Sequence, residues 1–338
     1  MKLRIPTLNT ITWYAGTAGV VALVALLVWL FRPNSIDVIN HRGIGGSTEL
    51  TSPITGGPCP GIANRAIAVM LSSDKEARPL SGIGQADIVF EIPVTPNGIT
   101  RMMAVYQCND PKEVGSIRSA RGSFIPLVQG LDPIYVHWGG ERDVEAQLKA
   151  HLTDDVDCLI YDGTTCTRKK GIPAPHDGFS TMSLIRAQAR ALGYAASMSL
   201  PAFPHTDTAP PRTNLASLAP DASISWPLGM DVLFHYDPAT NTYLRSRGGT
   251  PETDATTGAQ VRVSVVVVMH TTATFLYDQY TLVQTVGAGP ADIYQNGQQV
   301  SARWSKPSAT APLQFLNAQG KPVPLVVGGG HDQAISRH

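Results

Sequence analysis

The stretch "ADIVFEIPVTPNGITRMMAVYQC", residues 86–108, has the pattern of two β-strands joined by a turn. Residues 86–94 form a short apolar run bounded by turn residues, and residues 100–108 alternate in polarity; both patterns are typical of strands. Further strands are predicted at 66–71, 133–140 and 157–163. The first half of the chain is therefore expected to be built on a sheet.

Helical segments alternate with these strands. Residues 141–152 carry an apolar stripe with acidic residues in the first turn, as in an amphipathic helix. A second helix is predicted within 180–194, where Gly193 is a residue typical of helix C-termini. We also expect a helix over 118–129, despite the proline within it, which would kink or restart it. Alternating strands and helices predict an α/β (α+β) domain over residues 61–200.

The second half of the chain is predicted to be mainly β. Residues 201–225 are rich in proline and lack periodicity, so they mark a joint between domains. Beyond it, residues 226–338 contain a strong central strand in "QVRVSVVVVMHTTA", residues 260–273, and a type I′ hairpin signal at Asn296–Gly297. This half is expected to form a β-rich C-terminal domain.

The N-terminus has the pattern of a membrane anchor. The run from Trp13 to Phe31 is 19 residues long and uncharged, and at about 1.5 Å per residue it spans the roughly 30 Å hydrocarbon core of a bilayer. No small residues typical of a cleavage site separate it from Arg32. We therefore expect a cytoplasmic tip and transmembrane helix over 1–32, a flexible tether over 33–60, and an extracytoplasmic body anchored to the membrane.

Charge argues against nucleic acid as a partner. The chain has 26 basic and 26 acidic residues, and three of the basic residues lie in the first 32 positions, which hold no acidic residue. The remaining body is slightly acidic, whereas nucleic-acid binding needs a basic face that neutralises phosphates.

The cysteines indicate an exported protein rather than a metal protein. The chain contains Cys59, Cys108, Cys158 and Cys166 in a spacing that matches no zinc pattern. An even number permits two disulfides in an exported domain, and Cys158 with Cys166 brackets a short loop. Four unpaired cysteines are the alternative. We expect no metal.

Common catalytic signatures are missing, so no cofactor is expected. The chain has no G-x-S-x-G elbow, S-x-x-K pair, Walker A loop or H-E-x-x-H motif, and no G-x-G-x-x-G follows a strand.

Polar residues at predicted strand ends and turns are the remaining candidates for a site. Open sheets bind ligands at such edges, and the planar fork of arginine holds a carboxylate or phosphate by two parallel hydrogen bonds. The predicted ligand-binding residues are Arg101, Arg118, Arg121 and Asp177, and the predicted acid/base residues are His137 and His176.

Each candidate also has a structural interpretation. Arg118 and Arg121 are three apart, as on one helix face, and could pair with Asp87 or Glu91. His137 could be a hydrogen-bonded core residue, Arg101 could be structural, and His176 could be a turn residue.

Six short motifs occur in the order and spacing of a known family. They are "RPLSGIGQADIVFE", "GITR", "GSIRSAR", "YVHWGG", "YDG" and "APH". On these motifs the chain resembles, over about residues 60–335, the YerB-like family of bacterial envelope proteins, a domain of unknown function with N- and C-terminal parts. The resemblance implies an anchored envelope protein without an established activity, and it matches Arg101, Arg118, Arg121, His137 and His176 to the family pattern.

The chain departs from the family pattern at four places, and two of them lie in the second half. Asp177 stands where the family usually has Asn, and a transmembrane segment replaces the lipid-attachment cysteine. Glu252 stands where a Pro-His-x-Asp pattern would place histidine, and the end of the chain, "GGGHDQAISRH", lacks an expected Thr-Trp pair. We therefore place the site in the first half.

Three functions follow from these patterns. The first is binding of an anionic envelope ligand, a glycan or peptide carboxylate or a phosphate, by the arginines. The second is a hydrolase or transferase of envelope substrates with a histidine acid/base and arginine stabilisation of negative charge. The third is an interaction scaffold in which the arginines are structural.

Overall fold

The computed structural model describes residues 50–207, 221–225, 231–277 and 279–328, and the backbone of 332–337. The predicted membrane anchor at 13–31 and the tether residues 33–49 lie outside these ranges, so both stay predictions. None of the helices in the described part of the chain is long and apolar enough to cross a bilayer.

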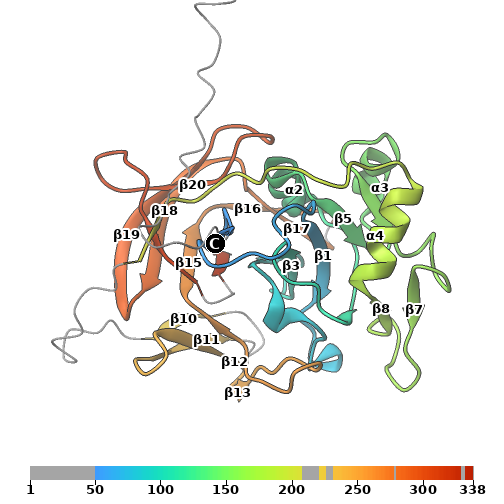
Figure 1. Cartoon of the computed structure of the whole chain (residues 1–338), viewed down its shortest axis with the longest axis horizontal. Helices are drawn as coiled ribbons and strands as arrows, with labels where there is room; N and C mark the ends of the chain where they lie inside the picture. The colour runs from blue at the N-terminus through green and yellow to red at the C-terminus, as the bar shows by residue number, and fades with distance from the viewer. Residues whose placement is uncertain (1–49, 208–220, 226–230, 278, 329–331, 338) are drawn as a thin grey trace, which may run out of the picture. The chain divides into compact units, whose positions relative to one another are not determined.

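One ten-stranded sheet runs through both halves of the chain (Figure 1). Its order is β20 (Gln314–Leu316), β19 (Gln298–Lys306), β18 (Gly287–Gln295), β15 (Val265–His270), β22 (Asp332–Arg337), β2 (Ile88–Pro93), β3 (Thr100–Tyr106), β1 (Ile67–Ser72), β5 (Ile134–His137) and β6 (Asp155–Asp157). Strand β22 is parallel to both β15 and β2, so it joins the strands of the two halves.

Alternating side chains of the central strands feed two cores on opposite faces of the sheet. From β3, Met103 and Val105 enter one core, while Met102 and Ala104 enter the other. The first core is covered by α2 (Ile125–Leu131) and α3 (Arg142–Lys149), and the second by α4 (Met182–Ala191). Because the central strands are buried on both faces, they appear in the sequence as nearly continuous apolar runs.

Smaller sheets surround the large one. The second half contributes β10 (Ala222–Ile224), β11 (Val232–Asp237), β12 (Thr242–Arg247), β13 (Thr250–Pro251) and β14 (Arg262–Val263) in one sheet, and the hairpin of β16 (Ala273–Leu276) and β17 (Tyr280–Val283). The remaining pairs are β9 (His205–Thr206) with β21 (Leu325–Val326), and β4 (Val114–Gly115) with β8 (Gly178–Ser180) and β7 (Cys166–Arg168). Short 3-10 turns lie at Lys75–Ala77, Ile83–Gln85 and Gly122–Phe124.

The predicted character of each half is confirmed: the first half mixes helices and strands, and the second is mostly β. The Asn296–Gly297 turn joins β18 to β19 with positive φ at both residues, as a type I′ hairpin requires. One sheet contains strands from both 61–200 and 226–338. The bounds of the two predicted domains stay predictions.

Two sequence predictions are wrong in detail. The strand expected at 157–163 ends at Asp157, and the chain then turns. Residues 50–60, assigned to the tether, pack against the body instead: Ile54 is fully buried, and the Pro53 carbonyl accepts a hydrogen bond from the Phe203 amide.

Four buried charges join β2 to the smaller sheet of the second half. Arg245 Nη2 lies 2.7 Å from Glu91 Oε2, and Arg245 Nε lies 2.6 Å from Glu252 Oε2. Arg247 Nη2 lies 2.5 Å from Glu91 Oε1. Burial alone would raise the pKa of Glu91, but the two arginines lower it to about 2. The two positive and two negative charges therefore neutralise one another inside the protein.

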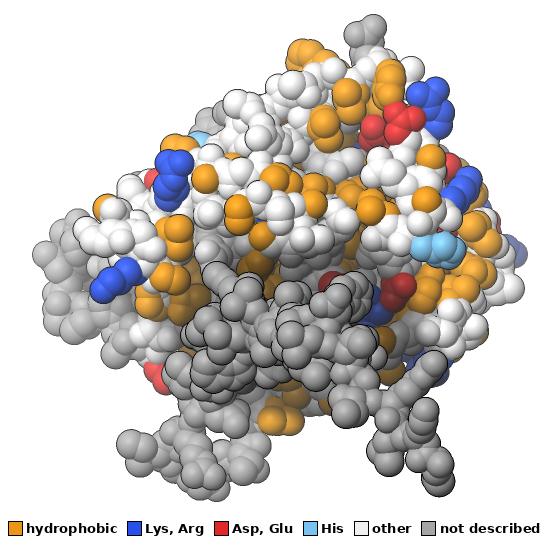
Figure 2. Space-filling model, turned by 90° about the horizontal axis from the view of Figure 1, so that it is seen from above, with side chains coloured by type: hydrophobic (Ala, Val, Ile, Leu, Met, Phe, Trp, Pro, Cys, Tyr) orange, Lys and Arg blue, Asp and Glu red, His pale blue; other side chains and the backbone are white. Residues whose placement is uncertain are grey.

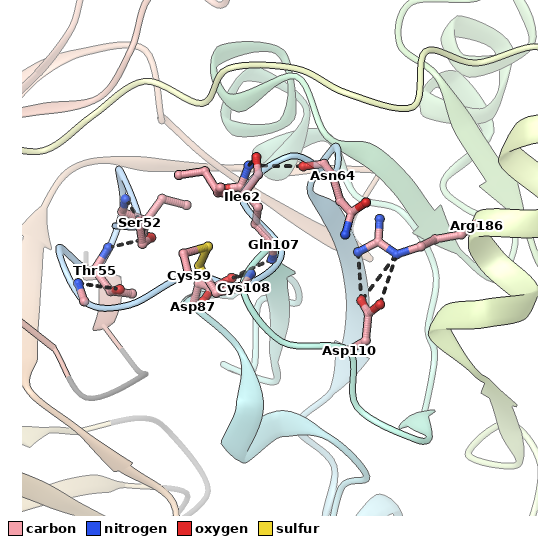
Figure 3. Close-up of a disulfide and its surroundings, with 12 residues drawn as sticks. Ser52, Thr55, Cys59, Ile62, Asn64, Asp87, Gln107, Cys108, Asp110 and Arg186 are labelled. Carbon is pink, nitrogen blue, oxygen red and sulfur yellow. Dashed lines mark hydrogen bonds and ion pairs between the residues drawn. A yellow bond between two sulfur atoms is a disulfide. The ribbon is translucent and has the colours of Figure 1, made fainter. Parts of the chain in front are cut away.

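Both disulfides form, which settles the alternative left open for the cysteines. Cys59 pairs with Cys108, and Cys158 pairs with Cys166. Figure 3 shows the first disulfide beside Asp87, whose carboxylate accepts hydrogen bonds from the amides of Gln107 and Cys108.

The other oxygen of Asp87, Oδ1, is buried without a hydrogen-bond partner among the described residues. Burial raises the pKa of Asp87 from 3.8 to about 6, even though the two backbone hydrogen bonds oppose this shift. A buried carboxylate with only half of its acceptors satisfied is the physical reason.

Replacing Arg247 with Met is expected to lower the free energy of unfolding by about 3–5 kcal/mol, because two buried carboxylates would share one arginine. Chemical denaturation measures this change. The double variant Glu252→Gln, Arg247→Met removes one charge of each sign and should lose less. A single variant within about 1 kcal/mol of the wild type would contradict the role assigned to the four charges.

Asp87 is expected to make stability fall as pH rises from about 4 to 6. The pKa of Asp87 is higher in the folded state than in the unfolded state, so the folded state binds more protons in this pH window. Protonated Asp87 therefore contributes about 3 kcal/mol to the free energy of unfolding at low pH, and this contribution is lost as pH rises through about 6. The variant Asp87→Asn should lack this dependence in denaturation series at several pH values. Asp110→Asn, which changes an exposed carboxylate near the same disulfide, should keep it.

Candidate functional site

The segment that carries Arg118 and Arg121 is extended, so the predicted helix over 118–129 begins later than expected. The 3-10 turn Gly122–Phe124 leads into α2, and Pro126 lies in the first turn of that helix, where its missing N–H costs no hydrogen bond. In an extended chain, residues three apart point to opposite faces. The two arginines therefore do not share one helix face.

Backbone hydrogen bonds fix Arg118 between three parts of the fold. Its amide donates to the carbonyl of Met70 on β1 at 2.9 Å, and its carbonyl accepts from the amide of Trp138 at 3.0 Å, just after β5. The neighbouring amide of Ile117 donates to the carbonyl of Gly178 at 2.7 Å. Arg118 thus lies beside β1 and the end of β5, next to the loop that carries His176.

Asp74 lies at the centre of the site. Its Oδ2 atom is 3.2 Å from Arg101 Nη1 and 3.3 Å from Arg118 Nη1, and it accepts a hydrogen bond from Ser72 Oγ at 2.8 Å. His176 Nδ1 lies 3.0 Å from Arg118 Nη1 and 3.9 Å from Asp74 Oδ2. We call Asp74, Arg101, Arg118 and His176 the Asp74 cluster.

The Asp74 cluster has more positive than negative charge. Burial, followed by repulsion from Arg118, lowers the pKa of Arg101 to about 9, so it still carries its charge at neutral pH. Its Nε atom is buried without a hydrogen-bond partner in the described part of the chain. Burial opposes ionisation of Asp74, yet Arg101, Ser72 and Arg118 together hold its pKa below 3.8. One carboxylate therefore faces two arginines.

The hydrogen bond between Arg118 and His176 fixes the form of the imidazole. A guanidinium only donates, so Nδ1 of His176 must accept and any ring proton lies on Nε2. Burial and the charge of Arg118 lower the pKa of His176 below 6.5, which favours this neutral form. His176 can therefore donate through Nε2, whereas Nδ1 is occupied.

Arg121 lies near this cluster without bonding to it. Its Nη1 atom donates to the carbonyl of Ala120, and its guanidinium lies 4.9 Å from the ring centroid of Tyr280 on β17. Its charge still lowers the pKa values of Arg101 and Arg118, although other causes are larger. It adds to the positive potential of the site.

Two of the predicted site residues have other partners. His137 is 1% exposed, with Nδ1 2.8 Å from the Gly139 carbonyl oxygen and Nε2 3.1 Å from Asp155 Oδ2. Asp177 lies 3.1 Å from Arg168. Neither forms a hydrogen bond or ion pair with the Asp74 cluster among the described residues.

The partners proposed from sequence for the two arginines are also engaged elsewhere. Asp87 accepts from backbone amides near the first disulfide, and Glu91 pairs with Arg245 and Arg247. The structural interpretation of Arg118 as a partner of Asp87 or Glu91 is therefore wrong.

Asp74 was not among the site residues predicted from the sequence. It follows the predicted strand 66–71 by three residues, and position at a strand end was the signal that identified the other candidates. No group of three or more His, Cys, Asp or Glu residues in the described ranges is arranged to hold a metal ion.

Charged side chains are sparse in this protein. On the face seen in Figure 2, lysine and arginine side chains stand mostly singly among hydrophobic and uncharged atoms. Charged residues make up 15% of the chain, against about 25% in typical domains. Several arginines around one carboxylate are unusual in such a sequence.

Comparison with known proteins gives the same family for both halves. The protein-family model described as "Protein of unknown function (DUF3048) N-terminal domain" matches residues 54–195. The family model of the DUF3048 C-terminal domain matches residues 223–330. The chain is 28% identical over 267 residues to "Putative lipoprotein YerB" of Bacillus subtilis (strain 168), covering 78% of this chain and 79% of that protein. The crystal structure of YerB from Bacillus subtilis superposes with a TM-score of 0.74 at 25% identity, covering 85% of this chain and 96% of that one. The whole Asp74 cluster lies within the N-terminal match.

Gly115 lies where β4 pairs with β8, opposite Phe179. The segment with Arg118 follows β4 and the loop with His176 precedes β8, so this pairing brings the two together. A Cβ atom there would lie 2.3 Å from Phe179 Cδ1 and 2.8 Å from the Gly178 carbonyl oxygen. Gly115→Ala is expected to lower the free energy of unfolding by about 3 kcal/mol. Gly163→Ala, where a Cβ meets nothing within 4 Å but φ is +80°, should cost about 1 kcal/mol. If both variants lose the same free energy of unfolding in denaturant titrations, the close contact at Gly115 does not restrict this position.

Proposed function

The chain belongs to the DUF3048 family, and from this premise we propose that it is a membrane-anchored extracytoplasmic protein that binds an anionic ligand of the cell envelope. The ligand is a carboxylate of a cell-wall glycan or peptide, or a phosphate. The Asp74 cluster is the binding site, and Arg121 adds to its positive potential.

The main support for this proposal is the net positive charge of the Asp74 cluster, in which two arginines face one carboxylate. Arg118 uses only Nη1 in its contacts with Asp74 and His176, so its Nε–H and Nη2–H donors have no partner among the described residues. These two donors point in parallel from one edge of the guanidinium, which suits an oxyanion. An anion there would also relieve the repulsion between Arg118 and Arg101.

An extracytoplasmic location is supported by three observations. The relative from Bacillus subtilis is named as a lipoprotein. Two disulfides join all four cysteines, which is typical of exported proteins. The apolar run 13–31 is long enough to anchor this chain in a membrane.

The enzyme alternative has weaker support than binding. It requires a histidine that takes up a proton, but Nδ1 of His176 is occupied by Arg118, and both ring nitrogens of His137 face acceptors in the core. His176 is suited to donating a hydrogen bond from Nε2 to a bound anion. A scaffold role requires structural arginines, and the unused donors of Arg118 argue against it.

Replacing Arg118 with Gln is expected to weaken binding of inorganic phosphate to the full-length protein about tenfold or more, because a charged hydrogen-bond donor is worth roughly 1.5–3 kcal/mol. Isothermal titration calorimetry measures the affinity, which should also fall as salt concentration rises.

The matched control is Arg142→Gln, since the Arg142 side chain is 83% exposed and pairs with Asp143. This variant changes net charge by the same amount and should stay within about twofold of the wild type, as expected for an exposed ion pair. The proposal fails if no probe that carries a carboxylate or phosphate binds the wild type, or if both variants weaken binding equally.

A further inference from the structure

Asp74 has one oxygen in use and one free. Oδ2 receives Arg101, Arg118 and Ser72, while Oδ1 has no hydrogen-bond donor among the described residues. The Asp74 side chain is 19% exposed, so part of it remains accessible. The carboxylate thus retains acceptor capacity on a residue whose orientation is already fixed.

Ser72 and the arginines hold this carboxylate in place. Ser72 Oγ donates to Oδ2 at 2.8 Å and accepts from the Asp74 amide at 3.2 Å. With Oδ2 held by three donors, the direction of Oδ1 is set by the protein and not by the ligand. Such fixed orientation is the usual property of a recognition group.

Arg118, which contacts the other oxygen of this carboxylate, has unused donors of its own. Nε–H and Nη2–H belong to the same guanidinium whose Nη1 contacts Asp74 Oδ2. The site therefore offers a negative acceptor and a positive two-pronged donor on two side chains that contact each other. A ligand that is only an anion would satisfy the arginine but would be repelled by Asp74.

We propose that the ligand is zwitterionic, with an ammonium group a few bonds from its carboxylate or phosphate, and that Asp74 Oδ1 binds the ammonium while Arg118 binds the anion. This inference rests on the proposed function and narrows it to a ligand class. An α-amino acid or peptide terminus and a phosphoethanolamine group share this chemistry.

Two matched pairs of probes test the proposal on the full-length protein by calorimetry. Glycine differs from acetate by its ammonium, and O-phosphoethanolamine differs from ethyl phosphate in the same way. The wild type is expected to bind the ammonium-bearing member of at least one pair about tenfold more tightly. The pair that shows the preference identifies the anion as carboxylate or phosphate.

The variant Asp74→Asn should abolish the preference while keeping or strengthening binding of the anion-only probe. Glu76→Gln is the matched control, because Glu76 is an exposed carboxylate two residues away, whose charge reaches His176. That variant should retain the preference. Thermal unfolding verifies that both variants fold.

If Asp74→Asn does not fold, Ser72→Ala serves instead, since it removes one hydrogen bond that orients Asp74 and keeps every charge. It should reduce the preference for the ammonium probe about threefold, as expected for a hydrogen bond worth under 1 kcal/mol net. The inference is overturned if the wild type binds both members of each pair equally, or if Asp74→Asn or Ser72→Ala keeps the full preference. Absence of binding by all four probes would instead overturn the proposed function.

Discussion

The buried pairing of Glu91 with Arg245 and Arg247 is the constraint on which the arrangement of the two halves depends. Glu91 lies on a central strand, whereas the arginines lie on β12 of a separate sheet, and all three side chains are 1% exposed. A buried charge is tolerated only with its partners in place. The smaller sheet therefore cannot move away from the large one without exposing or isolating these charges.

Strand β3 carries neighbouring residues that contact two different groups of charges, the Glu91 network and the Asp74 cluster. Thr100 Oγ1 donates to Glu91, and the next residue, Arg101, reaches Asp74. Adjacent residues on a strand point to opposite faces. Strand β3 thus lies between a buried network with two charges of each sign and the Asp74 cluster, in which two arginines face one carboxylate.

Local patterns predicted the strands and helices well, because burial and turn chemistry act over a few residues. The Asn296–Gly297 turn is one example, and the helix Met182–Ala191, which ends just before Gly193, is another. The extended form of the Arg118 segment was not predictable, since its hydrogen bonds go to Met70 and Gly178, far away in sequence. Glu252 appeared as a departure from a family motif, and only its contact with Arg245 explains it as a buried counter-ion.

Strand β22 gives the fold an order of assembly. It is hydrogen-bonded on one side to β2, where Ile88 faces Asp332, and on the other to β15. Until residue 332 has been synthesised, β2 presents an unpaired edge of the kind that promotes aggregation between chains. The large sheet is therefore complete only after the strand that begins at residue 332 has been made, and the first half depends on the second to cover this edge as well as for stability.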